Sequence, residues 1–382
     1  MAGPAGVGRA PGFAGVGLRR RRARYDRAQR RRASANSRGV SPLTGSHPSR
    51  DRRWSGIVHG RAGRYNPVDG PLPLACTPPP PRSVDSARYL VILNPAAGRG
   101  AAARAGSAIG SVLKAAGVRH HVVPTQARGH ATEIALRAAG EGWTAVVAAG
   151  GDGTVHEVAN GLLREAGDGP TVPMGIVPVG SGNDFAKLVG APTDAAAATR
   201  RLLQATPRRV DAGRVGDRFF TNGVGIGLDA RVGIEAAKVR RLRGIAIYLW
   251  ALARVLPRFR PPRMRVELDG VLVADGPLTL VTAANGGCHG GGFWICPAAR
   301  IDDGELDVAV ADALGTLGIL DLLPRVMRGT HVGRPRVRML RARRIRVTSP
   351  DPLPVHADGE ILSEAAHELE IKVLPGRLTV LG

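Results

Sequence analysis

The feature that most constrains the fold is a repeated alternation, between residues 88 and 190, of a short apolar run, a loop and a helix-like segment. The apolar runs are YLVILNP, VRHHVVPT, TAVVAAG and PMGIVPVG, and each precedes a segment with helical character. Strands that alternate with helices form βα units on a parallel sheet covered on both faces. The pattern therefore predicts a doubly wound α/β domain.

The pattern changes near Val210, where short strand-like runs joined by Gly, Asp and Pro turns begin. Such runs predict a second, largely antiparallel domain, a β-sandwich or a barrel. The terminal run HELEIKVLPGRLTVLG predicts a last hairpin with Pro375-Gly376 at its turn. We expect an α/β domain at 87–210 and a β-rich domain at 211–365, with the hairpin 366–382 as a candidate to return to the first.

Residues 1–86 form an Arg- and Pro-rich extension with 17 arginines, no lysine and four aspartates, or +13 of the formal +23; the other 296 residues carry +10. A basic excess favours anionic partners such as nucleotides or an acidic membrane surface. No apolar stretch follows the arginines, which argues against a secretory signal. We expect a disordered, dispensable extension, for which a start codon assigned too early is one explanation. A transit peptide and a lipid- or nucleic-acid-binding arm are the alternatives, but we expect no nucleic-acid partner.

Cysteine usage and one apolar stretch bear on localisation. The three cysteines form no C-x-x-C pair, which favours a reducing cytosol and gives no zinc pattern. The uncharged stretch from Gly244 to Ala253 is ten residues long, whereas a spanning helix needs about twenty. It is flanked by arginines, and two interpretations stay open: a helix in the membrane interface, or a core-facing helix with a basic rim. We expect a cytoplasmic protein on the inner face of the membrane, with a homodimer as one option for its oligomeric state.

Three glycine-rich loops carry the chemistry. GGDGT (Gly150 to Thr154) resembles a phosphate-binding turn that lacks the P-loop lysine. Thr154 and Glu157 form a predicted capping box, so the preceding amides should lie at a helix N-terminus, where anions bind. Without a lysine, neutralisation of a triphosphate falls to Mg²⁺, for which Asp152 is a candidate ligand. NPAAGRG and PVGSGNDFA also follow predicted strands, so all three loops should meet at the carboxyl edge of the sheet.

Together GGDGT, NPAAG, PVGSGNDFA and a late ADGE (Ala357 to Glu360) resemble the diacylglycerol kinase catalytic family, over essentially all of 88–382. That family includes bacterial lipid kinases and the sphingosine and ceramide kinases. The resemblance implies an α/β domain and a β-sandwich domain with the active site in the cleft between them. It implies an ATP- and Mg²⁺-dependent transfer of the γ-phosphate to the hydroxyl of diacylglycerol or a related lipid.

The resemblance also implies roles for individual residues. The expected ATP contacts are Asn94, Pro95, Ala96, Ala97, Gly98, Thr125, Gly150, Gly151, Asp152, Gly153, Thr154, His156, Ser181, Gly182 and Asn183. Asp152, Asp184 and Asp211 resemble an acidic network around a catalytic Mg²⁺. Arg300, Asp303 and Glu305 resemble a second, structural metal loop. Asp358 occupies the general-base position, and Glu360 the neighbouring acidic one.

Two alternatives to a lipid kinase remain at this stage. An NAD kinase shares the GGDGT turn, but the Asn-Asp pair of GSGNDFA favours the lipid kinases. A catalytically silent lipid- or nucleotide-binding relative would not need Asp152, Asp184, Asp211 and Asp358 together. His356 stands where many relatives have glutamine, which bears on the pH response of the site or its substrate choice.

Overall fold

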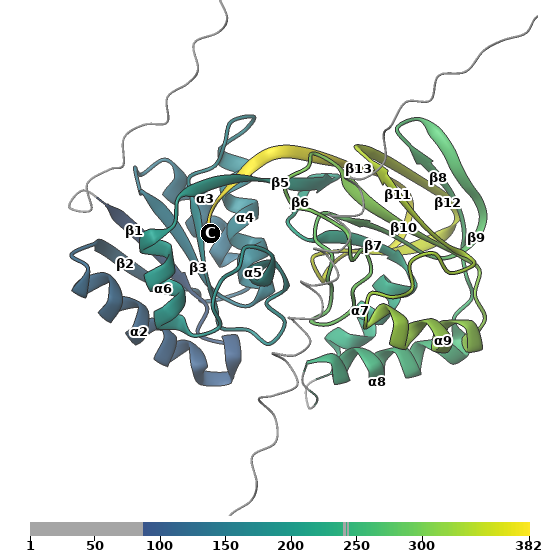
Figure 1. The fold of residues 1–382 in the computed structure, drawn as a ribbon, viewed down its shortest axis with the longest axis horizontal. Coiled ribbons are helices and arrows are strands. Elements are labelled where there is room, and N and C mark those ends of the chain that lie inside the picture. Colours follow the sequence, from purple (N-terminus) through teal and green to yellow (C-terminus); the bar gives the residue numbers. More distant parts are fainter. Residues whose placement is uncertain (1–86, 240–241, 243) are drawn as a thin grey trace, which may run out of the picture. The chain divides into compact units, whose positions relative to one another are not determined.

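The first lobe is the expected parallel sheet with helices on both faces (Figure 1). In this computed structural model, residues 87–239, 242 and 244–382 are described, so the predictions for the extension 1–86 lie outside the described residues. The strands are β1 (Arg88–Leu93), β2 (Arg119–Pro124), β3 (Ala145–Gly150) and β4 (Met174–Pro178). They run parallel in the order β2-β1-β3-β4.

Alternate residues of these strands enter two separate apolar cores. Leu90 and Ile92 pack beneath α3 (His130–Ala139) and α4 (Asp152–Glu165). Tyr89 and Val91 point the other way, toward α2 (Ala101–Ala115) and α6 (Ala195–Gln204). The short elements η2 (Ala97–Gly100) and α5 (Asp184–Leu188) complete the lobe. Burial on both faces explains why the strands are apolar throughout.

The second lobe is mostly antiparallel, so the predicted fold class is confirmed. Its strands are β5 (Pro207–Val215), β6 (Arg218–Phe220), β7 (Gly223–Gly227), β8 (Arg263–Leu268), β9 (Val271–Ala284), β10 (Leu306–Asp312), β11 (Val337–Ala342), β12 (Arg344–Ala357) and β13 (Glu360–Leu381). Its helices are α7 (Leu228–Ala237), α8 (Ile245–Val255) with η3 (Leu256–Arg258), and α9 (Thr316–Val326). The three helices share one apolar core that includes Leu228, Leu252 and Ile319.

The prediction of a terminal hairpin is wrong. β13 continues from Glu360 to Leu381, pairing first with β12, then with β5, and at Val380 with Met174 of β4. Pro375-Gly376 marks a shift of register rather than a reversal: Gly376 has a φ of 58°, and its N–H donates to Asp211 at 2.7 Å. The extra residues are accommodated as a bulge. The two lobes are thus joined by a continuous strand, and they lie within one compact unit.

The stretch from Gly244 to Ala253 belongs to α8, which has 11 residues. Within the part of the chain that the structure describes, no helix is both long and apolar enough to cross a membrane.

Candidate active site

The three glycine-rich loops meet at the carboxyl ends of β1, β3 and β4, as the sequence predicts. Asn94 Nδ2 donates to Thr154 Oγ1 at 3.0 Å, which joins the first loop to the second. The second and third loops touch through glycines, because a Cβ on Gly180 would lie 2.5 Å from the Cα of Gly151. Thr125 follows β2, and its N–H donates to Leu93 O at 2.8 Å. The loops therefore form one continuous, mostly backbone surface.

The predicted capping box of α4 is wrong. The helix begins at Asp152 with Gly151 as its N-cap, and no side chain caps it. The Glu157 carboxylate instead accepts the N–H groups of Gly129 and Ala131 at 2.9 and 3.2 Å, and so caps the neighbouring helix α3. The free amides at the start of α4 remain available to an anion, which is the property that the capping box was taken to indicate.

Asp152 organises the third loop. Its two carboxylate oxygens accept the N–H groups of Asn183 and Asp184 at 2.7 and 2.6 Å. Burial and, to a lesser extent, the negative charge of Asp184 raise the pKa of Asp152 above its usual range. Asp184 accepts from Lys187 Nζ at 3.0 Å and from the N–H of Gly291, in the second lobe, at 2.8 Å. Two neighbouring carboxylates, the buried Asp184 and the half-buried Asp152, are thus balanced by one lysine.

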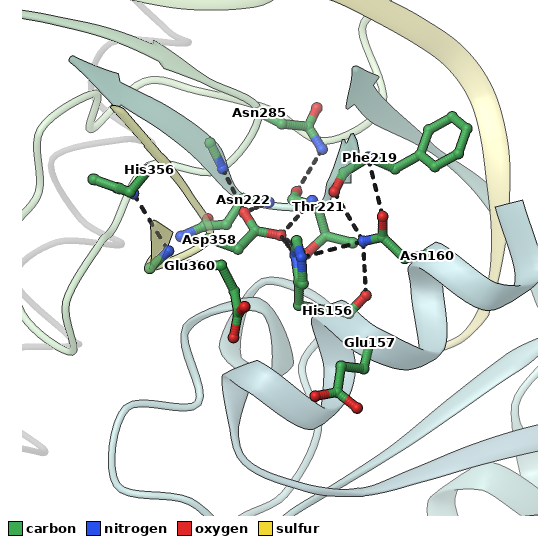
Figure 2. Close-up of polar contacts among 12 residues, drawn as sticks. His156, Glu157, Asn160, Phe219, Thr221, Asn222, Asn285, His356, Asp358 and Glu360 are labelled. Carbon is green, nitrogen blue, oxygen red and sulfur yellow. Dashed lines mark hydrogen bonds and ion pairs between the residues drawn. The ribbon is translucent and has the colours of Figure 1, made fainter. Parts of the chain in front are cut away.

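Asp358 lies in the two-residue turn between β12 and β13. Asp358 and Gly359 both have positive φ, 49° and 86°, as a type I′ hairpin turn requires. The carboxylate folds back onto three consecutive N–H groups: Thr221 at 2.7 Å, Asn222 at 2.8 Å and Gly223 at 2.9 Å. Figure 2 shows this carboxylate between the Thr221–Asn222 segment and the His156 ring. The Asp-Gly sequence therefore supplies both the turn and an anchored carboxylate.

His156 of α4 completes the shell of Asp358. Its Nδ1 donates to Asp358 Oδ2 at 3.0 Å, and its Nε2 lies 3.3 Å from the amide nitrogen of Asn160 (Figure 2). The Thr221 hydroxyl is a fifth donor to Asp358, at 3.0 Å. Burial by itself would raise the pKa of Asp358, but His156 and the backbone donors outweigh it and lower the pKa to about 2. Asp358 is consequently ionised throughout the physiological range.

A second buried polar group lies in the same part of the second lobe. Asp229, in the first turn of α7, accepts from Thr282 Oγ1 at 2.9 Å, and burial raises its pKa to about 6. His356 Nε2 lies 3.8 Å from Asp229, too far for a hydrogen bond, and burial lowers the pKa of His356 to about 4. His289 is also buried, and its Nε2 has no hydrogen-bond partner.

A cavity of about 450 Å³ connects these groups with the helices of the second lobe. Its polar lining includes Asp152, Asp184, Asp229, His289, His356 and Asp358. The rest is largely apolar and comes from α7, α8, α9 and the sheet, with Val232, Tyr248, Leu252, Leu280, Ile319, Leu322, Leu323 and Val326 among the lining residues. A largely apolar pocket that is lined in one part by carboxyl groups suits an amphipathic molecule with a polar head.

Asp211 lies beside the predicted structural metal loop rather than beside Asp152 and Asp184. Its oxygens accept the N–H groups of Gly376 and Gly304, each at 2.7 Å, and no hydrogen bond in the described chain links it to Asp152 or Asp184. Nearby, Asp303 Oδ2 is buried without a hydrogen-bond partner, and Arg341 Nη1 stands 3.7 Å from it. The Arg300 side chain pairs with Asp302, and Glu305 lies 3.7 Å from Arg341.

The comparisons with known proteins agree with this fold. Residues 88–215 match the diacylglycerol kinase catalytic domain, and residues 222–382 match the YegS C-terminal NAD kinase beta sandwich-like domain. The protein is a phosphotransferase with an alcohol acceptor. The chain belongs to the diacylglycerol kinase family of lipid kinases.

Three relatives illustrate the similarity. A diacylglycerol kinase of Mycobacterium tuberculosis is 32% identical over 302 residues, or 77% of this chain and 94% of that protein. A probable lipid kinase YegS-like of Pseudomonas aeruginosa is 35% identical over 266 residues, covering 66% of this chain and 81% of that protein. The crystal structure of a putative diacylglycerol kinase from Bacillus anthracis superposes with a TM-score of 0.67 at 26% identity, covering 80% of this chain and 98% of that one.

Sequence reasoning did not find several residues of the site. Thr221 and Asn222 bind Asp358 through backbone N–H groups, which any residue type could supply. Asn160 is a partner of His156 one helical turn away, and Arg128 forms an ion pair with Glu360 at 2.6 Å. The spacing of His156 and Asn160 on one helix face is the single signal that could have been read from the sequence.

Proposed function

We propose that this protein transfers the γ-phosphate of ATP, with Mg²⁺, to the hydroxyl of diacylglycerol or a closely related lipid. The observation that carries the proposal is the apolar cavity of about 450 Å³ whose polar end contains Asp152, Asp184 and Asp358. An apolar acceptor tail would lie among α7, α8 and α9, and its hydroxyl would face the carboxylates beside the glycine-rich loops. This supports a lipid acceptor over the dinucleotide that an NAD kinase takes, since the helical walls offer few polar groups.

The triphosphate would bind on the three loops. The backbone from Gly150 to Gly153, Ser181 and the first turn of α4 offer N–H groups, and the helix dipole favours negative charge there. The first loop, Asn94 to Gly98, borders this surface, and Thr125 lies at the next strand end. The His156 ring is buried against Asp358 and Asn160, so we assign it to positioning Asp358 rather than to the phosphates.

A divalent cation fits beside Asp152 and Asp184. Burial and mutual repulsion leave this pair short of positive charge, because Lys187 is its one cationic contact within the described chain. Among the described residues no three His, Cys, Asp or Glu side chains converge as a metal site, so the remaining ligands would be phosphate oxygens and water. When bound, Mg²⁺ supplies neutralisation of the charge that develops on the transferred group.

Asp358 is our candidate acceptor of the hydroxyl proton. Its five protein donors leave it no free lone pair (a carboxylate has about four), so one donor has to give way to the substrate. The Thr221 hydroxyl is the donor that can rotate aside, and the incoming hydroxyl would take its place on Oδ2. With a pKa of about 2, Asp358 is a weak base. Positioning and charge neutralisation therefore have to supply most of the acceleration, as is usual for phosphoryl transfer.

Glu360 and the Asp303 loop have supporting roles in this proposal. Glu360 is tied to Arg128, on the loop before α3, and so links the turn of Asp358 to the first lobe. The unpartnered Asp303 Oδ2 suits a cation, with Arg300 and Glu305 as neighbours. Arg341 already places a positive charge near Asp303, Glu305 and Asp307, which lessens the need for a metal there.

The test is a phosphorylation assay with γ-labelled ATP, Mg²⁺ and a total lipid extract, followed by identification of the labelled product, with NAD as a competing acceptor. We expect label in a phosphorylated lipid, loss of label with a chelator, and loss of activity in Asp184→Asn. Asp275→Asn is the matched control, because it removes an exposed carboxylate outside the cavity. Label in NADP, or in no lipid, would contradict the proposal. A silent relative would bind lipid and transfer nothing.

A further inference from the structure

Two polar side chains of the second lobe line the cavity together with Asp184. Tyr248 belongs to α8, and His289 lies in the segment between β9 and β10. The transfer proposed above uses neither of them. Their positions relative to the carboxylates indicate what they could bind.

The backbone around His289 ties this residue to the first lobe. The His289 N–H donates to Phe293 O at 2.8 Å, and the Phe293 N–H donates back to His289 O at 2.9 Å, which closes a tight turn. Inside the turn, Gly291 has a φ of 78°, and its N–H donates to Asp184 at 2.8 Å. The turn that carries the imidazole is therefore anchored on the carboxylate of Asp184.

The His289 ring also lies against the strand that holds Asp358. A Cβ on Gly223 would lie 2.5 Å from His289 Cε1, so the ring packs directly on the Gly223 backbone. The N–H of Gly223 is one of the three that bind the Asp358 carboxylate. The imidazole is consequently held between Asp184 and Asp358, the two carboxylates between which the proposed transfer takes place.

The Tyr248 phenol packs on the same turn. A Cβ on Gly290 would lie 3.3 Å from Tyr248 Cζ, the atom that carries the hydroxyl, and the ring meets Phe293 edge-on with 6.0 Å between centroids. Burial and, to a lesser extent, the charges of Asp184 and Asp152 raise the pKa of Tyr248, in agreement with a hydroxyl that faces these carboxylates. The phenol and the imidazole thus lie together where the apolar part of the cavity meets its polar part.

These two side chains are donors that need an acceptor. The side chains of three other lining residues already donate to protein oxygens: Thr221 to Asp358, Thr279 to Asp312 and Asn222 to Cys288. His289 is only 7% exposed, and its Nε2 has no partner among the described residues. A phenol carries an O–H, and an imidazole carries at least one N–H in either protonation state. Because a buried polar group without a hydrogen bond is costly, an oxygen of the bound lipid should supply the missing acceptor.

The surroundings narrow the kind of oxygen. An anionic oxygen would be repelled by Asp152, Asp184 and Asp358, so the acceptor atom should be uncharged. A carbonyl oxygen has two lone pairs and can accept from both donors, whereas a hydrocarbon tail accepts from neither. In an acylglycerol an ester carbonyl lies a few bonds from the free hydroxyl. One molecule could therefore reach Asp358 with its hydroxyl and the two donors with its carbonyl.

We propose that Tyr248 and His289 bind an ester carbonyl of the acceptor lipid and thereby select acceptors in which an acyl ester neighbours the free hydroxyl. This selection rests on the lipid kinase function proposed above, because it takes the acceptor to be a lipid alcohol. The two residues determine specificity, and the hydroxyl proton still goes to Asp358.

The experiment compares two water-soluble short-chain lipids that share the free hydroxyl and the chain length: a diacylglycerol, and the dialkylglycerol in which ethers replace both esters. Equilibrium dialysis of the radiolabelled lipids against the full-length protein, without nucleotide, gives their affinities. Initial rates with γ-labelled ATP and Mg²⁺ give kcat/KM for each lipid. The variants are Tyr248→Phe and His289→Leu, with His289→Gln as the replacement that keeps an N–H donor. Tyr89→Phe is the matched control, because it removes a phenol hydroxyl from the core of the first lobe, outside the cavity.

We expect the wild type and the Tyr89→Phe control to bind and phosphorylate the diacylglycerol about tenfold better than the dialkylglycerol. Tyr248→Phe and His289→Leu should each lose most of this preference, because only the diacylglycerol loses a hydrogen bond, and His289→Gln should keep most of it. If His289→Leu does not fold, Tyr248→Phe carries the same test, since it removes a single oxygen.

Equal affinity of the wild type for the two lipids would overturn the proposal. So would variants that weaken the binding of both lipids alike, which is what a merely structural role would produce. A binding preference that depends on both residues, without phosphorylation of either lipid, would refute the proposed function and still support the carbonyl site.

Discussion

Replacing Asp229 by asparagine should make the protein more stable at neutral pH. Burial raises the pKa of Asp229 to about 6, from an ordinary value of 3.8. The folded protein therefore binds this proton more tightly than the unfolded chain does. The associated stabilisation is complete below about pH 4 and is lost as the pH rises through about 6. At pH 7 the buried charge is a net cost that asparagine removes.

The magnitude follows from the two pKa values. The interval between 3.8 and about 6 corresponds to about 3 kcal/mol, at about 1.4 kcal/mol per pH unit. The Asp229 side chain keeps 14% exposure, so the measured gain should lie at or below this figure. Asparagine preserves both contacts, because its oxygen can accept from the Ala230 N–H and its NH₂ can donate to the Thr282 hydroxyl.

The assay is urea unfolding of wild type and Asp229→Asn between pH 4 and pH 8. The variant should gain stability at pH 7 and lose that advantage near pH 4. Asp358→Asn is the matched comparison, for which we expect the opposite change, a loss of stability at pH 7. Its pKa of about 2 makes ionised Asp358 stabilising, by about 2 kcal/mol at pH 7, and that contribution disappears as the pH falls from about 4 to about 2. If Asp229→Asn destabilised the protein at pH 7, the reasoning from burial would be refuted.

Three further outcomes test the site. His356→Gln should leave the stability at pH 7 nearly unchanged. The wild type should lose stability as the pH falls from 6.5 toward about 4, because the buried imidazole resists protonation, and the variant should not show this loss. Urea unfolding of both proteins across that pH range measures the difference. His156→Ala should lower the free energy of unfolding by about 2–4 kcal/mol, as it deletes a buried ring and a donor to Asp358; an unchanged melting temperature would contradict this. Gly182→Ala should weaken nucleotide binding, since its Cβ would lie 2.5 Å from Asp152 Oδ2, whereas Gly315→Ala, with open space around the Cβ, should not; a nucleotide titration separates them.

The first lobe was predictable because its signals are local. Each apolar strand is followed within a few residues by its loop and helix, and the parallel βα arrangement brings the loops to one edge. The same local reasoning failed at Glu157, which caps α3 rather than its own helix, 28 residues from Gly129. It also failed at Pro375-Gly376, where turn-forming residues sit in a bulge held by Asp211.

The contacts around Asp358 show more clearly which part of the site could not be predicted from the sequence. The Asp-Gly turn could be read from sequence, but the three amides that hold its carboxylate lie about 135 residues earlier. Backbone donors carry no residue signature, so the anchoring required the tertiary structure. Likewise, no pattern in the sequence indicates that burial raises the pKa of Asp229 whereas hydrogen bonding lowers the pKa of Asp358.

The path of β13 has a consequence for the order of folding during synthesis. Val380 pairs with Met174 of β4, so one edge of the first sheet is completed by residues made some two hundred positions later. Until they emerge from the ribosome, the edge of β4 stays open beside an already apolar core. The nascent first lobe is therefore an incomplete domain. It is vulnerable to edge-to-edge association while the second lobe is being translated, and β13 ends that period by joining β4 to the antiparallel strands of the second lobe.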